Sequence, residues 1–135
     1  MAICFALCTS HKGKLMPTID IFRLEPNPLI FSAGQTIFNI GDHGDLMYAV
    51  LEGEVNIIVN NTITETTIVG GVFGEMGVVD DDHIRTATAV AKTDCKLVAI
   101  NRKRFMFLVQ QTPYFAVEIM QILAGRLHRN DRYIP

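Results

Sequence analysis

The sequence predicts a mainly β domain with a helical tail, an α+β fold in which an antiparallel β-roll or jelly-roll barrel precedes C-terminal helices. From position 29 to position 101, short runs of apolar and β-branched residues alternate with turns rich in Gly, Asn and Asp. After Asn101 the apolar spacing changes from about two residues to about 3.6. With 135 residues, 49% of them hydrophobic, the chain is long enough to bury one such core.

The expected strands follow one another along the first three quarters of the chain. They cover residues 29–31, 36–38, 46–51, 55–59, 62–69, 84–91 and 96–100. Asn60 and Asn61 predict a tight hairpin between the fourth and fifth strands, because Asn tolerates positive φ. The glycine-rich residues 70–77 predict a turn that opens a short helix.

Two helices are expected after the strands. Asn101 is a good N-cap for a helix that runs to about residue 110, and Thr112 with Pro113 marks the start of a second. The second helix covers residues 114–129, and its apolar arc is broader than one helix face. We therefore expect a homodimer through this helix. The arc consists of Phe115, Val117, Ile119, Met120, Ile122, Leu123 and Leu127.

The domain is expected to occupy residues 16–135, with residues 1–15 as a dispensable or disordered tail. No run approaches the roughly 20 apolar residues of a membrane helix, so we expect no membrane association. Three cysteines without regular spacing indicate reduced thiols and a cytoplasmic protein. The formal net charge of -2 argues against a nucleic-acid partner.

The most informative segment is the stretch at positions 70–91, GGVFGEMGVVDDDHIRTATAVA. It places a carboxylate, Glu75, inside a glycine turn and an arginine, Arg85, ten residues further on. Unpaired amides at the start of a short helix, Gly74 without a Cβ, and a guanidinium together suit a cyclic phosphate. Glu75 would accept a hydrogen bond from a ribose 2′-hydroxyl. Small residues after Arg85 leave room for a ligand.

This segment resembles the phosphate-binding cassette of the cyclic-nucleotide-binding domain family, which includes kinase regulatory subunits and bacterial catabolite activator proteins. The stretches FNIGDHGDLMY, at positions 38–48, and VLEGEV, at positions 50–55, are similar to the family's glycine-bearing turns. The likeness covers residues 29–127. It implies a sensor that binds cAMP, or less expectedly cGMP, and couples binding to movement of the C-terminal helices.

The resemblance also implies roles for individual residues. Glu75 would bind the ribose, Arg85 the cyclic phosphate, and Thr86 the phosphate or the base. Gly41, Gly44 and Gly53 would be structural. The ligand-binding residues that it implies are Phe73, Gly74, Glu75, Met76, Arg85, Thr86 and Ala87, and those of a lid over the base are Arg129, Asn130 and Asp131.

Each of these residues also has a structural interpretation. Arg85 could form a salt bridge with Glu75 or with the acidic run 80–82, which otherwise is a solvated loop. Glu75 could favour a helix N-terminus, an effect of about 0.3–1 kcal/mol. Thr86 could reflect strand propensity, and it does not decide between adenine and guanine.

Other function classes fit the sequence less well. A cupin-type metalloenzyme needs a His-x-His pair on strands, and the four histidines, His11, His43, His83 and His128, lie in unrelated segments. We therefore expect no metal, no cofactor and no enzymatic activity. The alternative is an interaction module of the same fold that has lost nucleotide binding. Because no output segment is recognisable, we expect an unidentified protein partner in trans, or a chain that is one piece of a larger architecture.

Overall fold

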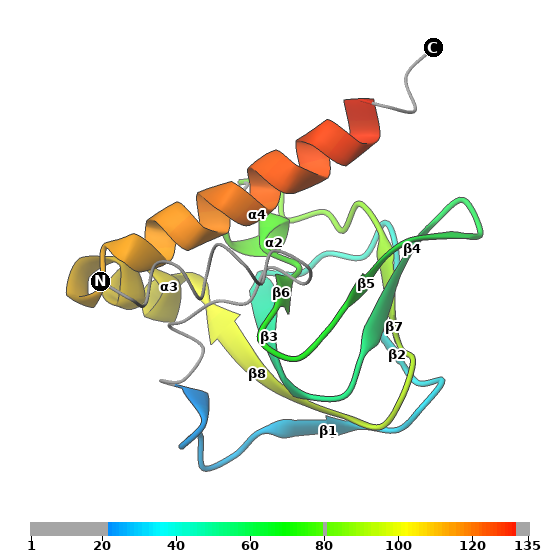
Figure 1. The fold of residues 1–135 in the computed structure, drawn as a ribbon, viewed down its shortest axis with the longest axis horizontal. Helices are drawn as coiled ribbons and strands as arrows, with labels where there is room; N and C mark the ends of the chain where they lie inside the picture. The colour runs from blue at the N-terminus through cyan, green and yellow to red at the C-terminus, as the bar shows by residue number, and fades with distance from the viewer. Residues whose placement is uncertain (1–21, 80, 132–135) are drawn as a thin grey trace, which may run out of the picture. The chain divides into compact units, whose positions relative to one another are not determined.

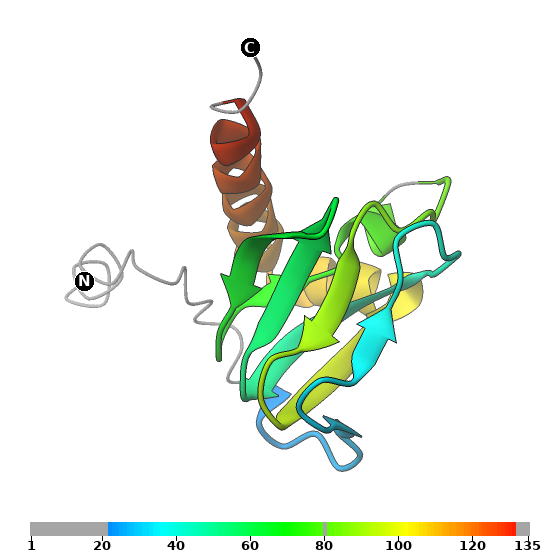
Figure 2. The same cartoon turned by 90° about the vertical axis from the view of Figure 1, so that its right-hand side faces the viewer.

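Two four-stranded antiparallel sheets form the β-roll in the computed structural model. The structure describes residues 22–79 and 81–131, and it describes side chains as far as residue 127. One sheet has the order β1-β8-β3-β6 and the other β2-β7-β4-β5, and Figures 1 and 2 show them on opposite sides of the interior. The strands are β1 (Leu29–Phe31), β2 (Thr36–Phe38), β3 (Leu46–Glu52), β4 (Val55–Val59), β5 (Thr62–Thr67), β6 (Val72–Phe73), β7 (Thr88–Ala91) and β8 (Cys95–Asn101).

The predicted β-roll followed by helices is thus confirmed. The predicted tail, residues 1–15, and the boundary at residue 16 lie outside the described residues. The described chain divides into two compact units, a roll that ends at Arg102 and a helical unit that begins at Lys103.

The core of the roll is apolar and lies between the sheets. In β3, the four consecutive residues from Met47 to Val50 are buried, so both faces of this strand are covered. Val55 of β4 and Leu97 of β8 are fully buried in the same core. Burial of such side chains contributes about 1.5–3 kcal/mol each, which makes this core the main source of the roll's stability.

The hairpin between β4 and β5 confirms the prediction made from its two asparagines. Asn60 and Asn61 have φ values of 53° and 61°, the left-handed conformation that a type I′ turn requires. The strands then pair from Val59 and Thr62 at the turn to Val55 and Thr67 at the far end. Since Val55 faces the core, Thr67 opposite it also faces the interior, where it is buried.

Three predicted boundaries were wrong around the glycine-rich segment. Strand β7 begins at Thr88 rather than at Ile84, because His83 has a φ of 56° and Arg85 pairs with the loop at Asp42. Strand β5 ends at Thr67 rather than at residue 69, where the chain turns toward Gly70. Val72 and Phe73, expected in a turn, form β6 against β3.

The two helices that follow the roll are α3 (Arg102–Gln111) and α4 (Tyr114–Asp131), close to the predicted bounds. Phe105 of α3 meets Phe115 of α4 edge to face, with ring centroids 5.6 Å apart. In the predicted apolar arc, Phe115, Ile119 and Ile122 are buried, whereas Val117, Met120 and Leu127 are exposed. None of the helices in the described part is both long and apolar enough to span a membrane.

Candidate ligand-binding site

The side chain of Arg85 connects the glycine-rich turn to strand β3. Its Nη1 donates to the carbonyl oxygen of Gly74 at 3.2 Å, and its Nη2 donates to that of Leu46 at 2.7 Å. The residue is 5% exposed. Its Nε is also buried and has no hydrogen-bond partner among the described residues. Arg85 therefore points toward the turn with its Nε–H unpaired among the described residues, and a buried unpaired donor costs about 1–3 kcal/mol.

Three glycines enclose the guanidinium, and each is close enough to exclude a Cβ. A Cβ at Gly44 would lie 2.7 Å from Nε, one at Gly77 would lie 2.8 Å from Nη1, and one at Gly74 3.0 Å from Nη1. The family resemblance implied a structural role for Gly44, and the structure shows what that role is: the lack of a Cβ leaves room for the Arg85 guanidinium. Gly74 additionally has a φ of 74°, which L side chains rarely adopt.

An aromatic ring covers the remaining side of the guanidinium. The Arg85 Cζ lies 4.0 Å from the centroid of the Phe38 ring, within the range of a cation–π contact. Phe38 in turn packs on Tyr48 and Phe73, with centroids 6.1 Å and 6.0 Å away. Tyr48 and Phe73 stack on each other at 5.3 Å. This aromatic trio joins the apolar core directly to the turn that begins at Gly74.

The electrostatics of the site follow from burial. Desolvation lowers the pKa of Arg85, while Tyr48 and the carboxylates of Asp45, Asp42 and Glu75 act in the opposite direction and favour the charged form. A guanidinium nevertheless remains charged at neutral pH. Desolvation likewise raises the pKa of Tyr48, and the Arg85 charge partly offsets that rise. The site thus holds a desolvated positive charge, which attracts an anion more strongly than an exposed one does.

Glu75 immediately precedes helix α2 (Met76–Val79) and is 4% exposed. Its carbonyl accepts hydrogen bonds from the amides of Val78 and Val79. The helix has only four residues, so a macrodipole gives a poor account of the carboxylate. Met76 is the first residue of the helix, where backbone N–H groups lack intrahelical acceptors.

The remaining predicted residues differ in burial and in the elements that carry them. Phe73 is buried in the aromatic trio, while Thr86 is exposed and Ala87 is half-buried in the bend before β7. The proposed lid residues lie in the last turn of α4, and their side chains are outside the described ones. They are Arg129, Asn130 and Asp131.

Sequence reasoning missed several residues around Arg85. Nothing in the spacing of Phe38 or Leu46 signals a contact with Arg85, which lies far along the chain from both. The salt-bridge interpretation of Arg85 is also incomplete, because both of its described hydrogen bonds go to main-chain carbonyls. Among the described residues, no group of three or more His, Cys, Asp or Glu side chains could hold a metal ion.

A model of the cyclic nucleotide-binding domain family matches residues 28–112, more than half of the chain. The chain belongs to this family. It is 33% identical over 107 residues to the cyclic AMP receptor protein of Thermus thermophilus, a match covering 76% of this chain and 49% of that protein. It is 25% identical over 123 residues to the cAMP-activated global transcriptional regulator of Pasteurella multocida, covering 87% and 59%. The chain spans about half the length of these curated relatives.

Solved structures agree with this assignment. The crystal structure of the Thermus thermophilus catabolite activator protein matches with a TM-score of 0.72 and 29% identity, over 88% of this chain and 58% of that one. A chain from work on a cyclic-GMP-dependent signalling pathway in bacterial phytopathogenesis matches with a TM-score of 0.69 and 26% identity, over 84% and 94%. These relatives are regulators, and the family takes cyclic nucleotides as ligands.

Proposed function

We propose that this chain is a non-enzymatic sensor of a 3′,5′-cyclic nucleotide, with cAMP the preferred ligand. The observation that supports this proposal is the enclosed Arg85 guanidinium. Three glycines and Phe38 surround it at the turn that leads to Glu75. The preference for cAMP is supported by the relative with 33% identity, which is named as a cyclic AMP receptor. Thr86 does not decide the base, so cGMP is the ligand against which the preference is measured.

The cyclic phosphate would bind between Arg85 and the turn. Its two free oxygens need donors, and the guanidinium and the amides of Gly74, Glu75 and Met76 can supply them. Nε of Arg85 has no hydrogen-bond partner among the described residues, which supports this role, since a ligand oxygen would give this donor an acceptor. We propose Thr86 and Ala87 as further contacts on the approach to β7, and Phe73 as the support beneath the turn.

Glu75 would select the sugar. A carboxylate next to a phosphate is repulsive unless it meets a donor, and the ribose 2′-hydroxyl is one. The 4% exposure of Glu75 fits a fixed contact better than a solvated surface charge. We propose Arg129, Asn130 and Asp131 as the lid over the base.

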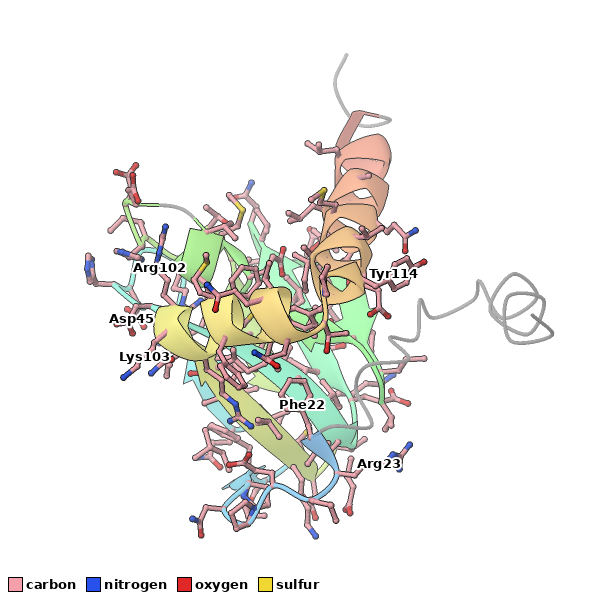
Figure 3. The ribbon with its side chains drawn as sticks, turned by 90° about the vertical axis from the view of Figure 1, so that its left-hand side faces the viewer. Phe22, Arg23, Asp45, Arg102, Lys103 and Tyr114 are labelled. Atoms are coloured by element: carbon pink, nitrogen blue, oxygen red, sulfur yellow. The ribbon has the colours of Figure 1, made fainter. Side chains whose placement is uncertain are left out.

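Ligand binding would be coupled to the C-terminal helices through Arg102, the first residue of α3. Its Nη1 donates to the carbonyl oxygen of Val78 in α2 at 3.1 Å, and it lies 3.8 Å from the carboxylate of Asp81. Figure 3 labels Arg102 at the start of α3. A shift of α2 on ligand binding would therefore move the residue from which α3 begins. Such a shift requires different ligand affinity in the two states.

The output of this movement would be an unidentified protein partner in trans. We also propose a homodimer through α4, supported by its exposed apolar residues Val117, Met120 and Leu127. A sedimentation mass of one chain at high concentration would contradict the dimer. A cytoplasmic location, without nucleic-acid binding, is supported by the free thiol of Cys95 and the net charge of -2.

The test is isothermal titration of the wild-type chain with cAMP, cGMP and the open-chain nucleotide 5′-AMP. We expect the tightest binding for cAMP and weak or no binding for 5′-AMP. Glu75→Gln should weaken cAMP by about tenfold but leave 2′-deoxy-cAMP within about twofold, because the deoxy ligand lacks the donor. Absence of binding by any cyclic nucleotide would favour the alternative, an interaction module of the same fold.

A further inference from the structure

His83 occupies an unusual place beside the ligand-binding turn. It lies in the loop between α2 and β7, two residues before Arg85, and its backbone has a φ of 56°. This left-handed conformation is uncommon for a residue other than glycine, and it costs about 1–3 kcal/mol unless its surroundings favour it. Two hydrogen bonds of His83, one from the ring and one from the main chain, hold it there.

The imidazole ring bonds to helix α2. Nδ1 of His83 lies 2.8 Å from the carbonyl oxygen of Gly77. Since a carbonyl oxygen can only accept, Nδ1 carries the proton and donates. Gly77 lies in a helix of only four residues. The carbonyl groups at the end of a helix have no amide donor within the helix. The histidine therefore caps the helix that follows the phosphate-binding turn.

The main chain of His83 bonds to a second segment. Its carbonyl oxygen accepts a hydrogen bond from the amide of Gly44 at 2.8 Å. Gly44 and Gly77 are two of the glycines that enclose the Arg85 guanidinium, and a Cβ at Gly77 would lie 2.8 Å from the Gly44 carbonyl oxygen. One residue thus bridges both walls of the space that Arg85 occupies.

We propose that His83 is a positioning residue for ligand binding, which holds Gly44 and Gly77 together so that Arg85 and the turn face a common phosphate. The inference rests on the proposed function, because it concerns the affinity for a cyclic nucleotide. It assigns the effect to the Nδ1–H donor rather than to the aromatic ring or to a charge on it.

Two substitutions separate these contributions. His83→Asn keeps a residue that tolerates positive φ and places a side-chain N–H as many bonds from the main chain as Nδ1 is. His83→Gly removes the donor, while glycine adopts the same φ without strain. Because both variants accommodate the backbone, a difference between them reports the side-chain hydrogen bond. His43→Ala is the control for a nearby ring, since its imidazole contacts that of His83 with centroids 5.8 Å apart.

The experiment measures cAMP affinity by isothermal titration, and hydrogen exchange of the Val78 and Val79 amides in α2. His83→Gly should bind cAMP about fivefold to tenfold more weakly and exchange these amides faster, while His83→Asn should remain within about twofold on both counts. His43→Ala should also remain near the wild type.

Three results would overturn the inference. Equal affinity and exchange in His83→Gly and the wild type would remove any positioning role. Equal losses in His83→Asn and His83→Gly would assign the effect to the imidazole ring instead of the donor. Faster exchange without a change in affinity would leave only local stabilisation.

The proposed function and the helix cap can fail separately. If the wild type itself binds no cyclic nucleotide, the proposed function fails. Unchanged α2 exchange in His83→Gly would refute the cap.

Discussion

The apolar interior of the roll and the segment from Gly70 to Arg85 are held in different ways. The interior depends on side-chain burial, and residues such as Val50, Val55 and Leu97 are completely enclosed. The glycine-rich segment shares this core through Phe73, but its turn at Gly74 is also held by side-chain hydrogen bonds from Arg85 to main-chain carbonyls. We therefore expect stability and the proposed ligand recognition to reside in adjacent but separable parts of the same unit.

The strongest test of this separation is a cavity in the roll. Leu97→Ala should lower the free energy of unfolding by about 2–5 kcal/mol, because it removes a fully buried side chain from the core. Urea unfolding measures the loss, and Ile30→Ala on the neighbouring β1, where Ile30 is 63% exposed, should cost about 0.5 kcal/mol. The folded Leu97→Ala chain should keep its cAMP affinity within about twofold. A tenfold loss of affinity would show that the two parts are not separable.

A methyl group beside Arg85 should lower the ligand affinity clearly, whereas the Leu97 change should mainly lower stability. Gly44→Ala places a Cβ where it would lie 2.7 Å from Nε, so the guanidinium must shift. We expect about 1–3 kcal/mol of destabilisation, and cAMP affinity about tenfold lower by isothermal titration.

The matched control for this change is Gly34→Ala, which meets open space but has a φ of 87°. It should cost about 1 kcal/mol of stability without changing affinity. If both alanines weakened binding equally, contact with Arg85 would not explain the Gly44 effect.

A smaller effect concerns the pH dependence of the core. Burial raises the pKa of the Cys95 thiol above its ordinary value of 9.0. The unfolded chain then loses this proton at a lower pH than the folded chain does. Stability is unaffected by this group well below pH 9 and falls as the pH rises from there through the folded pKa. Cys95→Ala should show a shallower decline in urea unfolding between pH 8 and pH 10, and parallel curves would contradict the assignment.

The smallest expected effect is at the surface of the roll. Lys92 and Glu54 form an ion pair of 3.3 Å, but their side chains are 52% and 41% exposed. Lys92→Ala should therefore change the free energy of unfolding by about 0.2–1 kcal/mol and leave cAMP affinity unchanged. The effect should diminish in high salt, and a loss of affinity would mean that the surface contributes to the site.

Much of the roll could be predicted because its signals are local. Asn60 and Asn61 fix a turn by their own tolerance of positive φ, and the change in apolar period locates the first helix after Asn101. The strand expected at 84–91 was shortened because hydrogen bonds between distant loops, such as that of Arg85 with Asp42, override strand propensity.

The site was less accessible to sequence reasoning. The spacing of Glu75 and Arg85 identified the turn, yet the position of the guanidinium depends on groups from other strands. Phe38 covers it from β2, and the carbonyl of Leu46 accepts its hydrogen bond from β3. Such contacts depend on the register of two sheets, which no local pattern in one sequence encodes.

The proposed recognition of the cyclic phosphate by Arg85 can be measured by isothermal titration of Arg85→Ala and Arg85→Lys with cAMP. Loss of a charge-assisted contact of about 1.5–3 kcal/mol predicts an affinity about tenfold to a hundredfold lower for the alanine variant. Lysine, which keeps the charge but lacks the planar fork, should lie between the alanine variant and the wild type. Unfolding curves recorded in parallel confirm that each variant is folded. A folded Arg85→Ala chain that binds cAMP as tightly as the wild type would contradict this role of Arg85.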